Sequence, residues 1–263
     1  MVKFFVISDV HGFYDEMIEA LDKAGFDIND PNHWVIGCGD YVDRGPQPWK
    51  TIQWLHNLPR KILVRGNHEE LFLDCCYRGE PYMHDIHNGT AQTIVDLASR
   101  NPMYQGDFVD AAEYALKRTK PFRDSMVDYF ETKNYIFVHS WIPVISKDGK
   151  PAHYVYGRSF EFNPNWRDAS PEEWRDSRWG NPFDMAARGL MPDKMVVFGH
   201  WHSSTGWAQS EGRSEFGEDA KFDPYYGDGF IAIDACTAHS GKCNVLVIED
   251  EFMEDDVNGN SAG

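Results

Sequence analysis

The sequence WVIGCGDYVDRG, residues 34–45, joins an apolar run to a loop rich in glycine and charge. The apolar part predicts a buried strand over 33–37. The polar part is Gly39-Asp40-Tyr41-Val42-Asp43-Arg44-Gly45. In open α/β sheets, ligands collect beyond the carboxyl ends of the strands. We therefore expect this loop to lie at a binding edge of a sheet.

Four other polar segments follow apolar runs in the same way. They are Ser8-Asp9-Val10-His11-Gly12, Gly66-Asn67-His68-Glu69, Val138-His139-Ser140 and Gly199-His200-Trp201-His202. Each of them alone has an ordinary structural explanation, such as a turn or a core histidine bonded to backbone. Together they place Asp, His and Asn side chains at one sheet edge, and this set suits divalent metals such as Mn²⁺, Fe or Zn²⁺.

The spacing of apolar residues predicts the elements between these segments. Strands are expected over 3–8, 33–37, 61–65, 135–138, 194–198, 230–233 and 244–248, and helices over 13–24, 46–57 and 69–77. A capping box at Ser170-Pro171-Glu172-Glu173 predicts the start of another helix. This order predicts an α/β core that becomes a two-sheet β-sandwich flanked by helices.

The region 79–131 differs from the rest of the chain because it has no strand signal. Its segments 90–99 and 108–118 have helical spacing. We therefore expect a single domain over 1–250, with about 79–131 as a helical insertion or cap. Residues 251–263 are acidic and then rich in Asn, Gly and Ser, so we expect a flexible tail.

The composition excludes several classes of partner. The chain has 263 residues, and its 25 basic and 42 acidic side chains give a net charge of −17. Phosphates of nucleic acids and anionic membranes would repel such a protein. No apolar run approaches the roughly 20 residues that span a bilayer. The five cysteines include no CxxC pair and no signal peptide is recognisable, so we expect a cytoplasmic protein with reduced thiols.

These motifs resemble those of the calcineurin-like metallophosphoesterases. Within that superfamily they are most similar to the phosphoprotein-phosphatase branch, which includes bacterial and lambda-phage-type serine/threonine phosphatases. The likeness rests on Asp9-x-His11-Gly12, Gly39-Asp40-x-x-Asp43-Arg44-Gly45 and Gly66-Asn67-His68-Glu69. It extends over about residues 2 to 248 and is firmest up to Glu70. It implies the metallophosphoesterase fold and two divalent metal ions, with Mn²⁺ favoured over Fe or Zn²⁺.

The resemblance also implies a set of metal ligands. Asp40 would bridge the two metals, and a hydroxide bridging them is the nucleophile in this family. Both metal sites would therefore use Asp40. The first is expected to use Asp9 and His11, and the second Asn67, His139 and His200. His202 is either a further ligand of the first metal, as in the broader superfamily, or a hydrogen-bond partner beside it.

The catalytic residues follow from the same motifs. Arg44 would hold phosphoryl oxygens, as would Asn67. His68 would protonate the leaving oxygen, and Asp43 would orient the His68 ring. The branch has a second phosphate-binding arginine, for which Arg178 is the candidate. One departure is Ser8, which stands where protein phosphatases usually have glycine before the first Asp.

Three functions are compatible with these residues. The first is a metal-dependent phosphatase acting on phosphoserine, phosphothreonine or phosphotyrosine in proteins, or on small phosphoesters. The second is a diadenosine polyphosphate hydrolase, because those enzymes share the three N-terminal motifs, but it would need an adenine slot. The third is a non-catalytic scaffold. A scaffold predicts lost ligands, and none is lost here. We expect the phosphatase.

Overall fold

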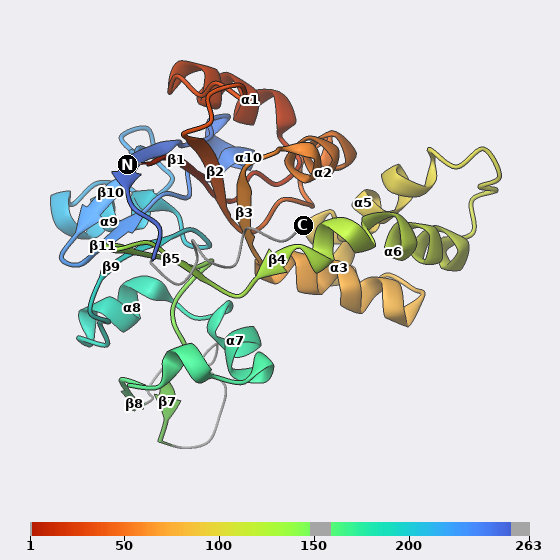
Figure 1. Ribbon diagram of the computed structural model, residues 1–263. Coiled ribbons are helices and arrows are strands. Elements are labelled where there is room, and N and C mark those ends of the chain that lie inside the picture. The colour runs from red at the N-terminus through yellow and green to blue at the C-terminus, as the bar shows by residue number, and fades with distance from the viewer. Residues whose placement is uncertain (1, 148–158, 254–263) are drawn as a thin grey trace.

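The computed structural model describes residues 2–147 and 159–253, and its core is a pair of β-sheets (Figure 1). The first sheet has five strands in the order β12-β1-β2-β3-β4. Their bounds are Val2–Ile7 (β1), His33–Cys38 (β2), Lys61–Val64 (β3), Met126–Val127 (β4) and Leu246–Asp250 (β12). Strands β1 to β4 are parallel and β12 is antiparallel to β1. The first three strands thus end at one edge.

The second sheet also has five strands, in the order β10-β11-β9-β6-β5. Their bounds are Phe130–Glu131 (β5), Tyr135–Phe137 (β6), Met195–Phe198 (β9), Tyr225–Gly227 (β10) and Phe230–Ala232 (β11). Strands β6, β9 and β11 are parallel, and the outer strands pair with them antiparallel. A separate hairpin pairs β7 (Ile145–Ser146) with β8 (Phe160–Glu161). The predicted two-sheet α/β sandwich is confirmed.

The sheets pack together because alternate side chains of each strand face opposite sides. Phe4 of β1, Phe137 of β6 and Val197 of β9 belong to the apolar core between the sheets. Their chain neighbours face outward: Phe5 packs against helices of the first layer, and Phe198 against helices of the second. Both faces of the central strands are therefore buried, which explains their nearly continuous apolar sequences.

Helices cover the outer face of each sheet. The first sheet is covered by α1 (Tyr14–Lys23) and α2 (Pro48–Asn57), whose buried residues share a core with β1. The second is covered by α7 (Pro171–Ser177) and α8 (Pro182–Ala187). The remaining short elements are η1 (Trp166–Asp168), α9 (Ser203–Glu211) and α10 (Thr237–Ser240). The capping box at Ser170 begins α7, as its sequence predicted.

A run of helices follows β3 and extends from the edge of the first sheet (Figure 1). It comprises α3 (Asn67–Arg78), α4 (Met83–Asn88), α5 (Thr90–Ala98) and α6 (Phe108–Asp124). Buried residues of α3, α5 and α6 belong to the same apolar core as α1 and α2. These helices therefore continue the core of the first layer.

Two details of the sequence analysis need correction or limitation. The absence of strands up to residue 131 is wrong, because β4 and β5 lie there; each has only two residues, too few to show a periodicity. In the expected tail, Phe252 pairs with Thr132 and packs against Phe4. Residues 254–263 lie outside the described part, and the domain boundaries stay a prediction.

Within 2–147 and 159–253, no helix combines the length and apolar character needed to cross a membrane.

The core between the sheets predicts a large effect for Phe137→Ala. Phe137 is fully buried, so truncation should lower the free energy of unfolding by about 3–5 kcal/mol. The matched control is Phe216→Ala, whose ring is 50% exposed and should change stability by about 0.5 kcal/mol or less. Urea unfolding of both variants measures this. Equal stability losses would contradict the packing described here.

Candidate metal centre

The five polar segments meet at one edge, where the parallel strands end. Asp9 and His11 follow β1, Asp40 follows β2, and Asn67 begins α3 after β3. His139 and His200 follow β6 and β9 of the second sheet. The site therefore lies where the carboxyl ends of both sheets come together.

Sharp backbone turns aim these side chains inward. The residues with a left-handed backbone include Asp9 (φ 50°), His11 (φ 48°), Asp40 (φ 58°) and His200 (φ 63°). Such conformations are uncommon outside glycine and cluster at functional sites, where the surroundings hold them. Four candidate ligands thus share a conformation that a plain turn would not require.

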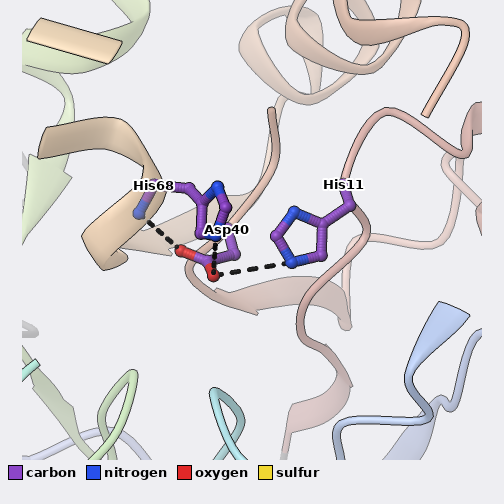
Figure 2. A group of neighbouring side chains, drawn as sticks. All are labelled: His11, Asp40 and His68. Atoms are coloured by element: carbon purple, nitrogen blue, oxygen red, sulfur yellow. Dashed lines mark hydrogen bonds and ion pairs between the residues drawn. The ribbon is translucent and has the colours of Figure 1, made fainter. Parts of the chain in front are cut away.

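One group of possible ligand atoms surrounds Asp40 on the side of β1. Side-chain atoms of His11, Asp40 and His68 lie within 4.8 Å of one another (Figure 2). His11 Nε2 is 3.6 Å from Asp40 Oδ2 and 4.0 Å from Asp9 Oδ1. All of these side chains are buried. His11 and Asp40 are therefore close together with Asp9 and His68 beside them, and their use as the first metal site stays a prediction.

A second group uses the other oxygen of Asp40. His139 Nε2 is 3.4 Å from Asp40 Oδ1, and the ring of His200 completes a second set of three. Asn67 Oδ1 lies 2.7 Å from His139 Nε2 and 3.1 Å from His200 Nδ1. Asp40 thus faces both groups, as a bridging ligand would.

The tautomers of two histidines leave lone pairs that face the centre. His139 Nδ1 donates to the carbonyl of Cys38 at 2.8 Å, and His11 Nδ1 donates to that of Val42 at 2.9 Å. Their protons are therefore on Nδ1, and the Nε2 lone pairs face Asp40 in His11 and the Asn67 amide oxygen, 2.7 Å away, in His139. His11 Nε2 is buried and has no hydrogen-bond partner among the described residues. A metal ion would satisfy it.

Burial keeps these imidazoles neutral. It lowers the pKa of His11 and of His139 well below the ordinary histidine value, and nearby positive groups lower both further. The pKa of His200 falls to about 3, first because of burial and then because of His68 and Arg44. Since a metal binds neutral imidazole, all three rings are in the form that coordinates.

The buried carboxylates at this site have raised pKa values, which a bound cation would lower. Burial raises the pKa of Asp9 well above its ordinary value, and the charges of Asp234 and Asp40 raise it further. Burial also raises the pKa of Asp40 and that of Asp234. A divalent cation would restore the charged forms of such carboxylates. Together with the orphaned His11 nitrogen, this donor set of O and N atoms fits two divalent metal ions.

Close contacts around Asp9 explain two neighbouring residues. Ser8 Oγ donates to Asp9 Oδ2, which also accepts the backbone N–H of His200 at 2.9 Å. A Cβ on Gly199 would lie only 2.0 Å from that oxygen. Gly199 is therefore required for β9 to approach Asp9. Ser8, the departure from the usual glycine, contributes a hydrogen bond.

The His68 ring is hydrogen-bonded to Asp43, and the catalytic roles expected for both residues stay predictions. The Asp43 carboxylate accepts the His68 Nδ1 proton at 2.8 Å. Arg44 Nη2 lies 3.1 Å from His68 Nε2, and because a guanidinium only donates, Nε2 accepts in this arrangement. Burial alone would lower the pKa of His68, but Asp40 and Asp43 outweigh it and raise the pKa. A phosphoryl group that attracts Arg44 would free Nε2 to carry a proton.

Two candidate residues are placed differently from the others. His202 belongs to neither three-residue group; its ring is edge-on to Phe216, and Nδ1 is 4.0 Å from Glu215 Oε1. Arg178 is buried, and its guanidinium donates to Glu70 and Asp128. The guanidinium is therefore engaged by carboxylates, because a buried charge needs partners. Their metal- and phosphate-binding roles stay predictions.

The sequence analysis missed two residues at this site. Asp234 follows β11, is buried, and acts on Asp9 as described above. Its signal was the same as for the others, an apolar strand that ends in an Asp. Glu69 was quoted without a role. Its carboxylate accepts the backbone N–H groups of Asp40 (3.0 Å), Tyr41 (2.9 Å) and Gly66 (2.9 Å), so it fixes the turn that carries the bridging candidate.

Comparison with known proteins identifies related chains. The profile of the family described as calcineurin-like phosphoesterase matches residues 2–204. An asymmetrical bis(5′-nucleosyl)-tetraphosphatase from Bacillus velezensis is 38% identical over 212 residues, which is 74% of this chain and 76% of that protein. A symmetrical one from Hamiltonella defensa is 24% identical over 236 residues, 77% of this chain and 84% of that protein.

Solved structures show the same fold. A cold-active protein tyrosine phosphatase mutant aligns with a TM-score of 0.53 at 15% identity, over 95% of this chain and 76% of that one. A structure titled as a putative diadenosine tetraphosphatase aligns with a TM-score of 0.50 at 16% identity, over 96% of this chain and 95% of that one. At these identities the likeness concerns the fold alone.

The position of Asp40 between the two groups predicts that Asp40→Asn removes both metals. An amide carries no charge and cannot offer two anionic oxygens, so metal content after Mn²⁺ loading should fall from two equivalents toward none. Elemental analysis of the folded variant measures this, with circular dichroism as a check on folding. The matched control is Asp22→Asn, an exposed position on α1. A folded Asp40→Asn protein that retains two metals would show that Asp40 is not shared.

Proposed function

Because the chain belongs to the calcineurin-like phosphoesterase family, we propose that it is a two-metal phosphatase that hydrolyses phosphomonoesters of proteins or small molecules. The observation that carries this choice is the pair formed by His68 and Asp43 beside the candidate metal centre. An alcohol leaves phosphorus poorly as an alkoxide and needs a proton. A positioned acid supplies that proton.

The two metals would lower the pKa of a bound water and neutralise charge on the phosphoryl group. The residues of the chain do the rest. Arg44 presents a planar fork of donors to phosphoryl oxygens and in doing so leaves His68 Nε2. Once Arg44 has moved away, His68 Nε2 takes up a proton from solvent. As the oxygen of the water, which has given one proton to solvent, bonds to phosphorus and the bond to the leaving oxygen breaks, His68 transfers its Nε2 proton to that leaving oxygen. The products are an alcohol and inorganic phosphate.

Asp43 supports this transfer in two ways. Its carboxylate fixes the ring of His68 through Nδ1, and its charge stabilises the protonated ring. Asp40 acts on the same ring, since its Oδ2 lies 3.9 Å from His68 Nε2. Asp43 therefore positions the His68 ring, and the negative charges of Asp43 and Asp40 favour its protonated form.

A second function is favoured by a different observation, the similarity to bis(5′-nucleosyl)-tetraphosphatases. We propose hydrolysis of dinucleoside polyphosphates as the alternative. A nucleotide leaves through a phosphate oxygen, whose second pKa is about 6, so its departure needs little help from an acid. The two functions therefore differ in how strongly they should depend on His68.

A substrate panel separates the two functions. Protein loaded with Mn²⁺ is assayed on p-nitrophenyl phosphate, a phosphoserine peptide and diadenosine tetraphosphate. We expect cleavage of the two monoesters, lost with a chelator and restored by Mn²⁺. Cleavage of diadenosine tetraphosphate alone would establish the second function instead. No cleavage of any of the three by metal-loaded protein would contradict both.

The acid role predicts that His68→Asn depends on the leaving group. For phosphoserine, kcat should fall by about 10²–10⁴, the usual contribution of general acid catalysis. For p-nitrophenyl phosphate the loss should be smaller, because that phenolate departs without a proton. Metal content should stay at the wild-type level. The control is His56→Asn, an exposed histidine on α2. An equal loss on both substrates would remove His68 from the acid role.

A further inference from the structure

The turn between α4 and α5 contacts the loop that carries Asp43 and Arg44. The backbone N–H of Arg44 donates to the carbonyl of Asn88 at 3.1 Å. Gly89 packs so closely that a Cβ there would lie 2.6 Å from the Arg44 nitrogen. The N–H of Asp43 donates to Thr93 Oγ1 at 3.1 Å. Residues 88–93 therefore hold this loop from outside.

The loop needs such support because its backbone is strained. Asp43 has φ 72° and Arg44 has φ 63°, and both are non-glycine residues in the left-handed region. Conformations of this kind persist only where neighbouring structure holds them. The support comes from a segment 44 or more residues further along the chain, in the region that the sequence suggested as a helical insertion or cap.

One contact reaches the side chain of Asp43 itself. Thr90 Oγ donates to Asp43 Oδ2 at 2.6 Å, and the same oxygen accepts the His68 Nδ1 proton at 2.8 Å. Thr90 and Asp43 are both fully buried. Asp43 Oδ1 is buried and has no hydrogen-bond partner among the described residues. The orientation of the carboxylate thus depends on the donors to Oδ2.

We propose that Thr90 is a positioning residue for the acid. Its hydroxyl fixes the rotation of the Asp43 carboxylate, which in turn fixes the ring of His68 so that Nε2 faces the leaving oxygen. Without this hydroxyl, the Asp43 carboxylate retains only the hydrogen bond from His68 Nδ1 and can rotate about its Cβ–Cγ bond. This inference rests on the proposed function, because it requires His68 to act as an acid.

The test removes the hydroxyl while keeping the shape of the side chain. Thr90→Val is isosteric and cannot donate, and Thr90→Ser retains the donor. The matched control is Thr51→Val in α2, where another fully buried threonine hydroxyl donates to the carbonyl of Gln47 at 3.2 Å. The substrates are phenyl phosphate, whose phenol has a pKa of about 10, and p-nitrophenyl phosphate, whose leaving group is more acidic.

We expect Thr90→Val to lower kcat on phenyl phosphate about tenfold, as for the loss of a hydrogen bond to a charged group. KM and metal content should not change, and the loss on p-nitrophenyl phosphate should be smaller. Thr90→Ser should restore the wild-type rate, and Thr51→Val should have no effect. In a His68→Asn background, Thr90→Val should cause no further loss, because the group it positions is gone. Thr90→Ala repeats the comparison should the valine variant not fold.

The inference alone would be overturned by equal losses on both esters, by no rescue with serine, or by a full additional loss in the His68→Asn background. Each would mean that Thr90 only stabilises the loop. If His68→Asn shows the leaving-group effect and Thr90→Val behaves like wild type, the acid stands and Thr90 has no part in it. If the wild-type protein cleaves neither ester, the proposed phosphatase function fails and this inference fails with it.

Discussion

The burial of the Asp40 carboxylate between two sets of ligand atoms is the constraint on which the rest of the site depends. One oxygen faces His11 and the other faces His139, so the two sheets must end at the same place. Its backbone is left-handed and is held by the carboxylate of Glu69. A buried anion with no positive partner would destabilise the fold, and divalent cations bound at these ligands would remove that penalty. The sandwich therefore serves to bring β2 and β6 together at their carboxyl ends.

The helices after β3 serve the same constraint from outside the sheets. α3 begins with Asn67 and carries Glu69, so the helix start supplies a candidate ligand and the group that fixes the Asp40 turn. The α4–α5 turn then holds Asp43 and Arg44. Because α3, α5 and α6 share an apolar core with α1 and α2, this support is packed into the core of the first layer.

The proposed acid role of His68 and the proposed phosphate-binding role of Arg44 are linked by one contact. Arg44 lies against His68 Nε2, so the guanidinium cannot stay there while that nitrogen carries a proton. A phosphoryl group that draws Arg44 away lets the charges of Asp40 and Asp43 favour the protonated ring. Substrate binding and readiness of the acid would thus be coupled. This matters for alcohol leaving groups and little for nucleotides, which is the physical difference between the two proposed functions.

Much of this protein could be predicted from its sequence. Apolar runs that end in Asp, Asn or His located the long strands and the residues at their ends, because a buried strand and a polar turn leave local patterns. The two-residue strands β4 and β5 escaped, because two residues show no period. Only the tertiary structure could pair Arg178 with Glu70 and Asp128, or Thr90 with Asp43, since these partners are separated by 47 or more residues. Local sequence determines which residues are available at a turn, and the packing of distant segments decides which of them touch.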